Sequence, residues 1–125
     1  MQFKIHYTRE EARALLPQVK IWLDQLAFAK REMDQLDEKL SKALGLGDDL
    51  GGPMVNKWIR TLSQMHDILK RFNAREIQVK DLERGLIDFP AFVGGKEVFL
   101  CWEKDEDDIE YWHDLDTGFS GREKL

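Results

Sequence analysis

Two runs of apolar residues constrain this chain more than any other feature of its sequence. Within each run the apolar residues are spaced alternately three and four apart, which is the pattern of a coiled-coil seam. The glycine-rich segment GLGDDLGGP at 45–53 separates the runs with strong helix breakers. The pattern predicts an antiparallel helical hairpin over about residues 9–75. The expected seam residues are Val19, Trp22, Leu26, Ala29, Met33, Leu36, Leu40 and Ala43, then Val55, Trp58, Leu62, Met65, Leu69 and Phe72.

The first helix has a recognisable start. Thr8 and Glu11 have the spacing of a capping box, in which the hydroxyl and the carboxylate bind backbone N–H groups at a helix terminus. We therefore expect the helix to begin near Arg9. Pro17 lacks an amide hydrogen and its ring crowds the carbonyl of Arg13, which kinks or restarts a helix. The sequence predicts a short helix followed by a long one.

A second apolar stripe lies off the seam of the first helix. Ile21 and Phe28 are one heptad apart, and a two-helix hairpin does not bury both stripes. Either the sheet or another subunit must cover them. The stripe predicts self-association, with a homodimer as the expected state.

Beyond Arg75 the pattern changes to that of β-strands. Short apolar runs at 77–79, 86–92, 98–102 and 109–113 are joined by Gly94-Gly95 and by an acidic stretch. Pro90 has no N–H for a strand ladder, which places its strand at an edge or a bulge. We predict a single α+β domain over 1–125, with the helical hairpin followed by a small antiparallel sheet of three or four strands. The tail at 114–122 is expected to be ordered and folded back on this sheet.

Charge and composition exclude several classes of protein. The formal net charge is −5, and residues 103–116 hold eight acids and one lysine. No extended basic surface is therefore available for nucleic acid. No apolar run approaches the roughly 18 residues of a membrane span, and the N-terminal MQFKIHYTREE has no apolar signal core. With one cysteine and no zinc-binding Cys/His pattern, the sequence predicts a cytoplasmic protein that binds neither membranes nor nucleic acids.

Four motifs occur in order along the chain. They are YTREEARALLP at 7–17, KDLERGLIDFP at 80–90, VFLCWE at 98–103 and WHDLDTGFSGR at 112–122. Together they resemble a prokaryotic family of uncharacterised small proteins, a domain of unknown function. The resemblance implies that the family signature lies in the β half and its tail, and it implies no reaction, cofactor or ligand.

His113 is the main candidate for chemistry. A carboxylate can orient its imidazole as a general base or a metal ligand, and Asp114, Asp116 and Asp88 are the available partners. The possible metal ligands are therefore His113, Asp114 and Asp116. The alternative is a structural histidine satisfied by hydrogen bonds, since no HxH, HxxxH or HExxH spacing accompanies it.

Cys101 lies inside an apolar strand. Burial there raises the pKa of a thiol and leaves it unreactive. Catalytic use requires a neighbouring cation or His113 on the same face of the sheet.

Two arginines of the β half stand next to glycines, in Arg84-Gly85 and Gly121-Arg122. Each guanidinium can be displayed from a turn to bind a carboxylate or phosphate. The alternative is an internal ion-pair network that fastens the tail, in which Arg122 is expected to reach Asp88 or Glu83.

The tryptophans divide into two groups. Trp22 and Trp58 occupy seam positions and are predicted to pack in the core. Trp102, Trp112 and Phe119 either line a ligand cleft or close the small core of the sheet.

These observations predict a non-enzymatic binding or assembly module, because no nucleophile with an adjacent base, paired metal spacing or phosphate loop is visible. The alternative is a metal-dependent or acid/base enzyme centred on His113 with nearby carboxylates. The candidate ligand-binding residues are Arg84, Asp88, Trp102, Trp112, His113, Asp114, Asp116 and Arg122.

Overall fold

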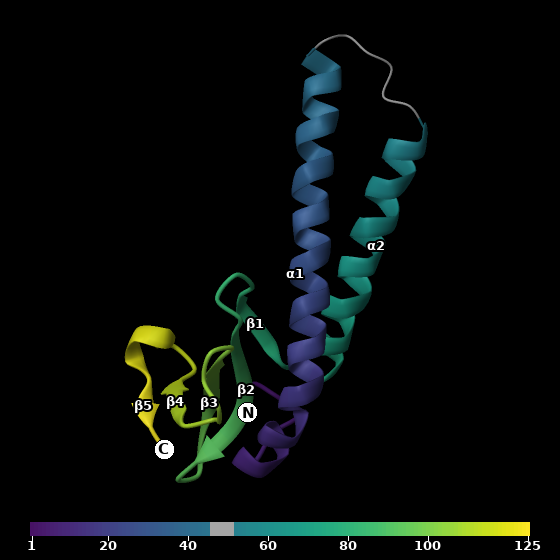
Figure 1. The fold of residues 1–125 in the computed structure, drawn as a ribbon. Coiled ribbons are helices and arrows are strands. Elements are labelled where there is room, and N and C mark those ends of the chain that lie inside the picture. The colour runs from purple at the N-terminus through teal and green to yellow at the C-terminus, as the bar shows by residue number, and fades with distance from the viewer. Residues whose placement is uncertain (46–51) are drawn as a thin grey trace.

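The computed structural model describes residues 1–45 and 52–125, and it confirms an α+β fold. Helices α1 (Arg9–Gly45) and α2 (Gly52–Ala74) form an antiparallel hairpin, and the sheet packs beside its lower half (Figure 1). Most of the predicted connection at 45–53 lies outside the described residues. The five antiparallel strands are paired in chain order, where three or four were predicted. They are β1 (Gln78–Asp81), β2 (Leu86–Val93), β3 (Lys96–Glu103), β4 (Tyr111–Asp114) and β5 (Glu123–Lys124).

The start of α1 follows the prediction. The backbone N–H of Thr8 donates to the Glu11 carboxylate at 3.0 Å, and the N–H of Glu11 donates to the Thr8 hydroxyl at 3.1 Å. This reciprocal capping box satisfies two donors that a helix leaves without intrahelical partners. The helix accordingly begins at Arg9.

The prediction of a separate short helix before Pro17 is wrong. Residues 9–45 form one helix with Pro17 inside it, although Figure 1 shows the first turns inclined to the rest. Ala12 and Leu16 on one side of the proline and Val19 on the other are all buried in the same core. Their burial offsets the loss of one helical hydrogen bond at Pro17, so the helix bends instead of ending.

The seam of the hairpin becomes more exposed toward the connection between the helices. The first six predicted seam residues of α1 are buried, whereas Leu40 and Ala43 are half-buried. Trp58 was predicted in the core, but it is only half-buried and its indole N–H donates to Asp37 at 2.8 Å. Figure 1 shows why: the helices diverge toward their connection. On α2 only Phe72 of the predicted seam residues is fully buried, and the other buried residues are Thr61 and Ile68. The predicted seam residue Val55 is exposed, and Leu62, Met65 and Leu69 are half-buried.

The sheet presents two different faces. Alternate strand residues point toward the helices and join their core, while the intervening ones point to the outer face. The helix-facing set is Ile87, Phe89, Ala91, Val98, Leu100 and Trp102. The outer set includes Asp88, Phe99, Cys101 and His113, all buried as well. β3 therefore has side chains buried on both faces, as its apolar sequence requires.

Pro90 lies where the sheet opens to one side. β1 pairs with β2 only at Leu86–Asp88, so no strand flanks Pro90 on that side. Its carbonyl instead accepts the backbone N–H of Tyr7 at 2.7 Å. The prediction that the strand of Pro90 lies at an edge is wrong, since β2 lies between β1 and β3. The missing N–H is tolerated because β1 ends before Pro90 and the N-terminal segment pairs there instead.

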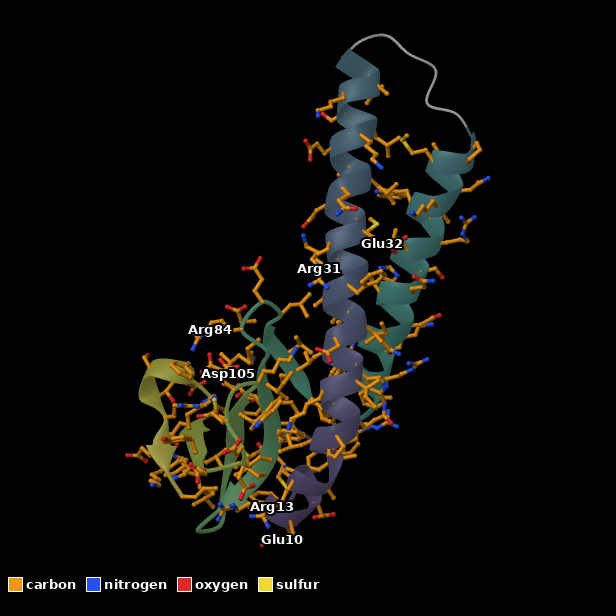
Figure 2. All side chains as sticks on the ribbon, in the orientation of Figure 1. Glu10, Arg13, Arg31, Glu32, Arg84 and Asp105 are labelled. Carbon is orange, nitrogen blue, oxygen red and sulfur yellow. The ribbon has the colours of Figure 1, made fainter. Side chains whose placement is uncertain are left out.

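Two carboxylates of the acidic stretch between β3 and β4, Glu106 and Asp108, are paired with arginines. Asp108 binds Arg13 through two hydrogen bonds of 2.8 Å and also lies 3.3 Å from Arg9. Figure 2 shows Arg13 at the start of α1. Glu106 binds Arg122 of the tail. These ion pairs join both ends of the chain to one loop of the sheet.

The N-terminal segment is held to β3 by one carboxylate. Glu97 accepts the backbone N–H of Gln2 at 2.7 Å and of Phe3 at 3.0 Å, and it lies 2.7 Å from Nε2 of His6. Phe3 packs on Phe99 of the outer face, with ring centroids 5.3 Å apart. The segment therefore covers one end of that face.

These hydrogen bonds lower the pKa of Glu97 from its ordinary 4.5 to about 2. Because the folded pKa lies below the unfolded one, their stabilising effect is present above pH 4.5 and is lost as the pH falls toward 2. We expect NMR titration to show Glu97 ionising near pH 2, with the amide signals of Gln2 and Phe3 shifting in the same range. Titration of Glu97 near pH 4.5 would contradict these hydrogen bonds, and Glu97→Gln should abolish the pH-dependent shifts of the two amide signals.

The tail after β4 is ordered. A 3₁₀ turn, η1 (Phe119–Gly121), returns the chain to β5, which pairs with β4, and the N–H of Leu125 donates to the carbonyl of Glu110 at 2.8 Å.

No helix among the described residues has the length and apolar character to cross a membrane.

The sheet leaves the second stripe of α1 uncovered: Ile21 and Phe28 are 51% and 59% exposed.

Candidate functional site

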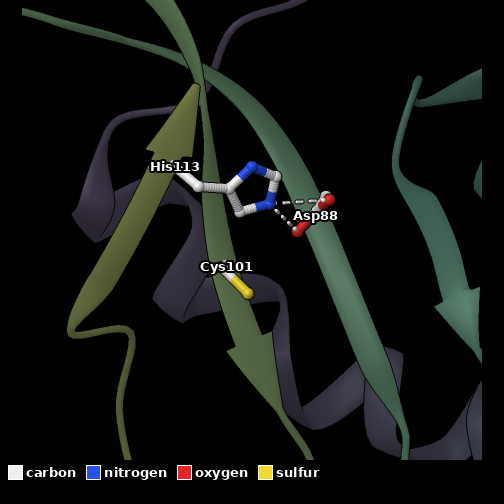
Figure 3. Close-up of side chains that lie close together, drawn as sticks. All are labelled: Asp88, Cys101 and His113. Carbon is white, nitrogen blue, oxygen red and sulfur yellow. Dashed lines mark hydrogen bonds and ion pairs between the residues drawn. The ribbon is translucent and has the colours of Figure 1, made fainter. Parts of the chain in front are cut away.

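Three neighbouring strands bring Asp88, Cys101 and His113 together on the outer face of the sheet (Figure 3). Asp88 of β2 stands directly opposite Cys101 of β3. His113 of β4 stands opposite Phe99, two residues from Cys101, so it lies diagonally across from the thiol. All three residues are buried.

Both ring nitrogens of His113 have hydrogen-bond partners. Nε2 lies 3.0 Å from each carboxylate oxygen of Asp88, and Nδ1 lies 2.7 Å from the backbone carbonyl oxygen of Asp114. A carbonyl oxygen only accepts, so Nδ1 carries a proton. Nε2 lies within hydrogen-bond distance of both Asp88 oxygens, so the two side chains form a coupled buried pair.

Burial dominates the electrostatics of this pair. Asp88 is 1% exposed and His113 is 2% exposed. Loss of solvent raises the pKa of Asp88 above its ordinary value, while the charge and hydrogen bond of His113 and the charge of Lys80 lower it. The net direction is upward, so a proton is held more tightly here than on a carboxylate in water.

The thiol of Cys101 is unreactive, as the sequence indicated. Burial and the charge of Asp88 raise its pKa to about 12, against the opposing effect of Arg122. His113 does lie on the same face, which was the condition for catalytic use. Its Nε2 is directed at Asp88, however, so no base is positioned to activate the sulfur.

A pocket of about 230 Å³ opens above the pair, between the outer face and the tail. The sheet supplies its floor and the tail supplies its roof. Lys80, Leu86 and Phe99 were not predicted as site residues. The alternation of side chains along a strand could have indicated Lys80, because Ile77 and Val79 on the core side imply that Lys80 points outward. The full lining is Lys80, Leu86, Asp88, Phe99, His113, Leu115, Asp116, Thr117, Gly118 and Phe119.

Comparison with known proteins gives one match. The family model described as an uncharacterized conserved protein, DUF2203, matches residues 6–125. The chain belongs to the DUF2203 family. No curated protein and no solved structure matches it. All the pocket and cluster residues of this DUF2203 chain lie within the matched range.

Of the predicted site residues, the DUF2203 fold brings together Asp88, His113 and Asp116, the last at the pocket wall. It separates Trp102 and Trp112 from them. Both indoles lie on the helix-facing side of the sheet, where Trp102 is fully buried, so they belong to the core and not to a ligand cleft. The strand alternation that places His113 outward places its neighbour Trp112 inward.

Asp114 does not act on His113 through its side chain. Its carboxylate lies 2.7 Å from Nζ of Lys96, and only its backbone carbonyl contacts the imidazole. The predicted ligand set of His113, Asp114 and Asp116 is therefore not the cluster that the fold assembles. Asp88 and Cys101 take the places of the two later carboxylates, because register across strands, and not sequence proximity, decides which side chains meet.

Arg84 and Arg122 form the internal network that the sequence left as an alternative. Arg122 binds Glu106 through contacts of 2.9 and 3.1 Å, so the expected partners Asp88 and Glu83 are wrong. Arg84, on the turn before β2 (Figure 2), binds Glu103 at 2.9 Å. Each guanidinium carbon lies 4.2 Å from the ring centroid of Phe119. The ring is thus held by two cations, which fixes the roof of the pocket.

We expect Arg122→Ala to reduce the free energy of unfolding by about 1–3 kcal/mol, since it leaves the part-buried Glu106 without its charged partner. Thermal or urea denaturation measures the change. Exposed Lys124 offers the control, because Lys124→Ala removes a tail cation for which no ion pair is found in the described structure. Equal stability of both variants would show that the pair does not fasten the tail.

Proposed function

We propose that this DUF2203 protein is a non-enzymatic binding module whose ligand occupies the pocket beneath the tail. The observation that carries the proposal is a pocket of about 230 Å³ placed directly on the buried Asp88–His113 pair. Leu86 and Phe99 provide apolar contact, while the pair and Lys80 provide polar groups. Such a site suits a small organic molecule, below the roughly 300–1,000 Å³ of drug-sized ligand pockets.

The hydrogen bonding of the site supports binding over catalysis. Both nitrogens of His113 are engaged, and the Cys101 thiol is held protonated. An acid–base enzyme centred on His113 has one supporting observation, since Asp88 binds Nε2 and both line the pocket. That alternative requires a ring nitrogen to leave its partner and reach a substrate. Consumption of a pocket ligand by the wild type, but not by His113→Gln, would favour it.

The binding proposal is tested by filling the pocket. Thr117→Trp places a large ring at the pocket wall, and Ser120→Trp places the same ring on the exposed tail outside the lining. A small-molecule library is screened by NMR, with ligands identified by shifts at Leu115 and His113. We expect Thr117→Trp to abolish these shifts and Ser120→Trp to retain them. A library that shifts neither signal in the wild type would overturn the proposal.

We also propose that the protein assembles as a homodimer through the exposed stripe of α1. Beside Phe28 lies a groove of about 530 Å³ between α1 and α2, lined also by Ile68, Asp67 and Arg71. A twofold contact places the same surface of both copies together. It can then bury the exposed Ile21 and Phe28 and set Arg71 of one copy against Asp67 of its partner. This charge complementarity favours a second copy as the occupant.

Sedimentation tests the dimer. We expect a mass near twice 14.7 kDa for the wild type at micromolar concentration. Phe28→Glu should reduce it to the monomer mass, whereas Ile59→Glu, at an exposed apolar residue outside the groove lining, should not. A monomeric wild type would contradict the assembly.

The cytoplasmic location also stays a proposal, which cell fractionation tests.

A further inference from the structure

We propose that Asp88, Cys101 and His113 form a binding site for one divalent ion of the zinc type. The three side chains offer a carboxylate oxygen, a sulfur and an imidazole nitrogen, and these atoms all lie within 4.8 Å of one another. The inference goes beyond the small-molecule site and does not rest on it.

The separations suit tetrahedral coordination. Ligand atoms about 2.1 Å from a tetrahedral ion lie about 3.4 Å apart, and a thiolate at about 2.3 Å lies slightly farther from the others. Nε2 of His113 and the Asp88 oxygens are already 3.0 Å apart. All three donor atoms lie within 4.8 Å of one another, so we expect rotations of the Asp88 and Cys101 side chains to bring them around one ion.

The donor set selects the class of metal. Metal binding releases the proton that the free Cys101 thiol carries. The resulting thiolate, one imidazole and one carboxylate form a mixed sulfur, nitrogen and oxygen set, which zinc and cobalt(II) accept. Ca²⁺ and Mg²⁺ prefer oxygen ligands and are disfavoured here. Three protein ligands leave a fourth position, and Asp88 and His113 both border the pocket on that side. Water or a ligand group in the pocket can fill it.

The surroundings of the cluster orient its ligands as metal sites require. The carbonyl of Asp114 accepts from Nδ1 of His113 at 2.7 Å, so the neutral ring presents the lone pair of Nε2 to the cluster. A backbone carbonyl on the second nitrogen is the usual partner of a metal-binding histidine. Nη1 of Arg122 lies 4.0 Å from Sγ of Cys101 and can donate to a thiolate there. Both contacts are present in the structure without an ion, so they do not depend on metal binding.

Cobalt binding to the full-length, untagged protein tests the site. The protein is stripped with a chelator and titrated with Co²⁺, then with Zn²⁺ in competition. We expect one ion per chain, a thiolate-to-cobalt charge-transfer absorption and the visible bands of tetrahedral cobalt, all removed by one equivalent of Zn²⁺. No binding at micromolar concentration, or cobalt spectra without the thiolate band, would overturn the proposal.

Variants locate the ligands. Cys101→Ser and Asp88→Asn should each weaken Zn²⁺ binding by at least the 10- to 100-fold that loss of a second-shell partner causes. His66→Gln, at an exposed histidine of α2, should leave the affinity unchanged. Circular dichroism identifies any variant that fails to fold. The cobalt spectrum of the wild type tests the metal site even if a variant does not fold. Wild-type affinity in both folded ligand variants would contradict the site. Thr117→Trp should retain zinc, which separates this test from that of the small-molecule site.

Discussion

His113→Ala is expected to reduce the free energy of unfolding by about 3–5 kcal/mol, because it leaves a buried carboxylate without its partner. Asp88 is 1% exposed, and in the described structure only the His113 side chain ion-pairs with it. Urea denaturation followed by circular dichroism, with a chelator present, measures the loss in the metal-free protein. His66→Ala, at an exposed position, should change the stability by less than about 0.5 kcal/mol.

The loss should depend on pH in a definite direction. Burial already raises the pKa of Asp88, and removal of His113 removes two interactions that lower it. A carboxyl group whose folded pKa lies above its unfolded pKa favours folding at low pH, and this contribution is lost as the pH rises through the folded value. The destabilisation by His113→Ala should therefore be larger at pH 7 than at pH 5.

Asp88→Asn separates charge from hydrogen bonding in the same pair. The amide can still donate to Nε2 of the Nδ1-protonated ring, so it should cost less than His113→Ala, about 1–3 kcal/mol. If His113→Ala proves as mild as His66→Ala, the pair is not a coupled buried pair, and the site would need a different description.

Trp102→Ala is expected to cost about 3–5 kcal/mol through the cavity that it opens in the core. Trp102 is fully buried, and its indole N–H donates to the carbonyl of Glu106 at 3.0 Å. The side-chain carboxylate of the same residue binds Arg122 of the tail. We therefore expect faster hydrogen exchange at the amides of Arg122 and Leu125 in the variant.

Trp102→Phe is the matched control. It keeps most of the buried aromatic surface but leaves the Glu106 carbonyl without the indole donor, which should cost about 1–3 kcal/mol. Circular dichroism measures both variants, since tryptophan fluorescence changes with the substitution itself. A cost below about 1 kcal/mol for Trp102→Ala would mean that the core relaxes around the missing ring.

The helices and the strands could be predicted from the sequence because the patterns that indicate them are local. A period of three and four fixes a helix face, and the Thr8–Glu11 box fixes its start, within a few residues of chain. The errors came from packing over longer distances. Pro17 stays inside α1 because buried neighbours hold both sides of it, and Trp58 is half-buried because the helices diverge there.

The candidate site could be predicted only in part, because it too depends on packing between distant parts of the chain. Alternation along each strand assigns Cys101 and His113 to a face, but the register between strands decides that Asp88 meets both of them. Arg122 likewise had several acids within reach, and the fold of the tail selected Glu106. The sequence by itself determined the two helices, the antiparallel sheet and the chemical types available on its outer face, because periodicity and turn residues act locally. Only the tertiary structure decided which side chains touch, because strand register, helix bending and the path of the tail are set by the burial of the whole core.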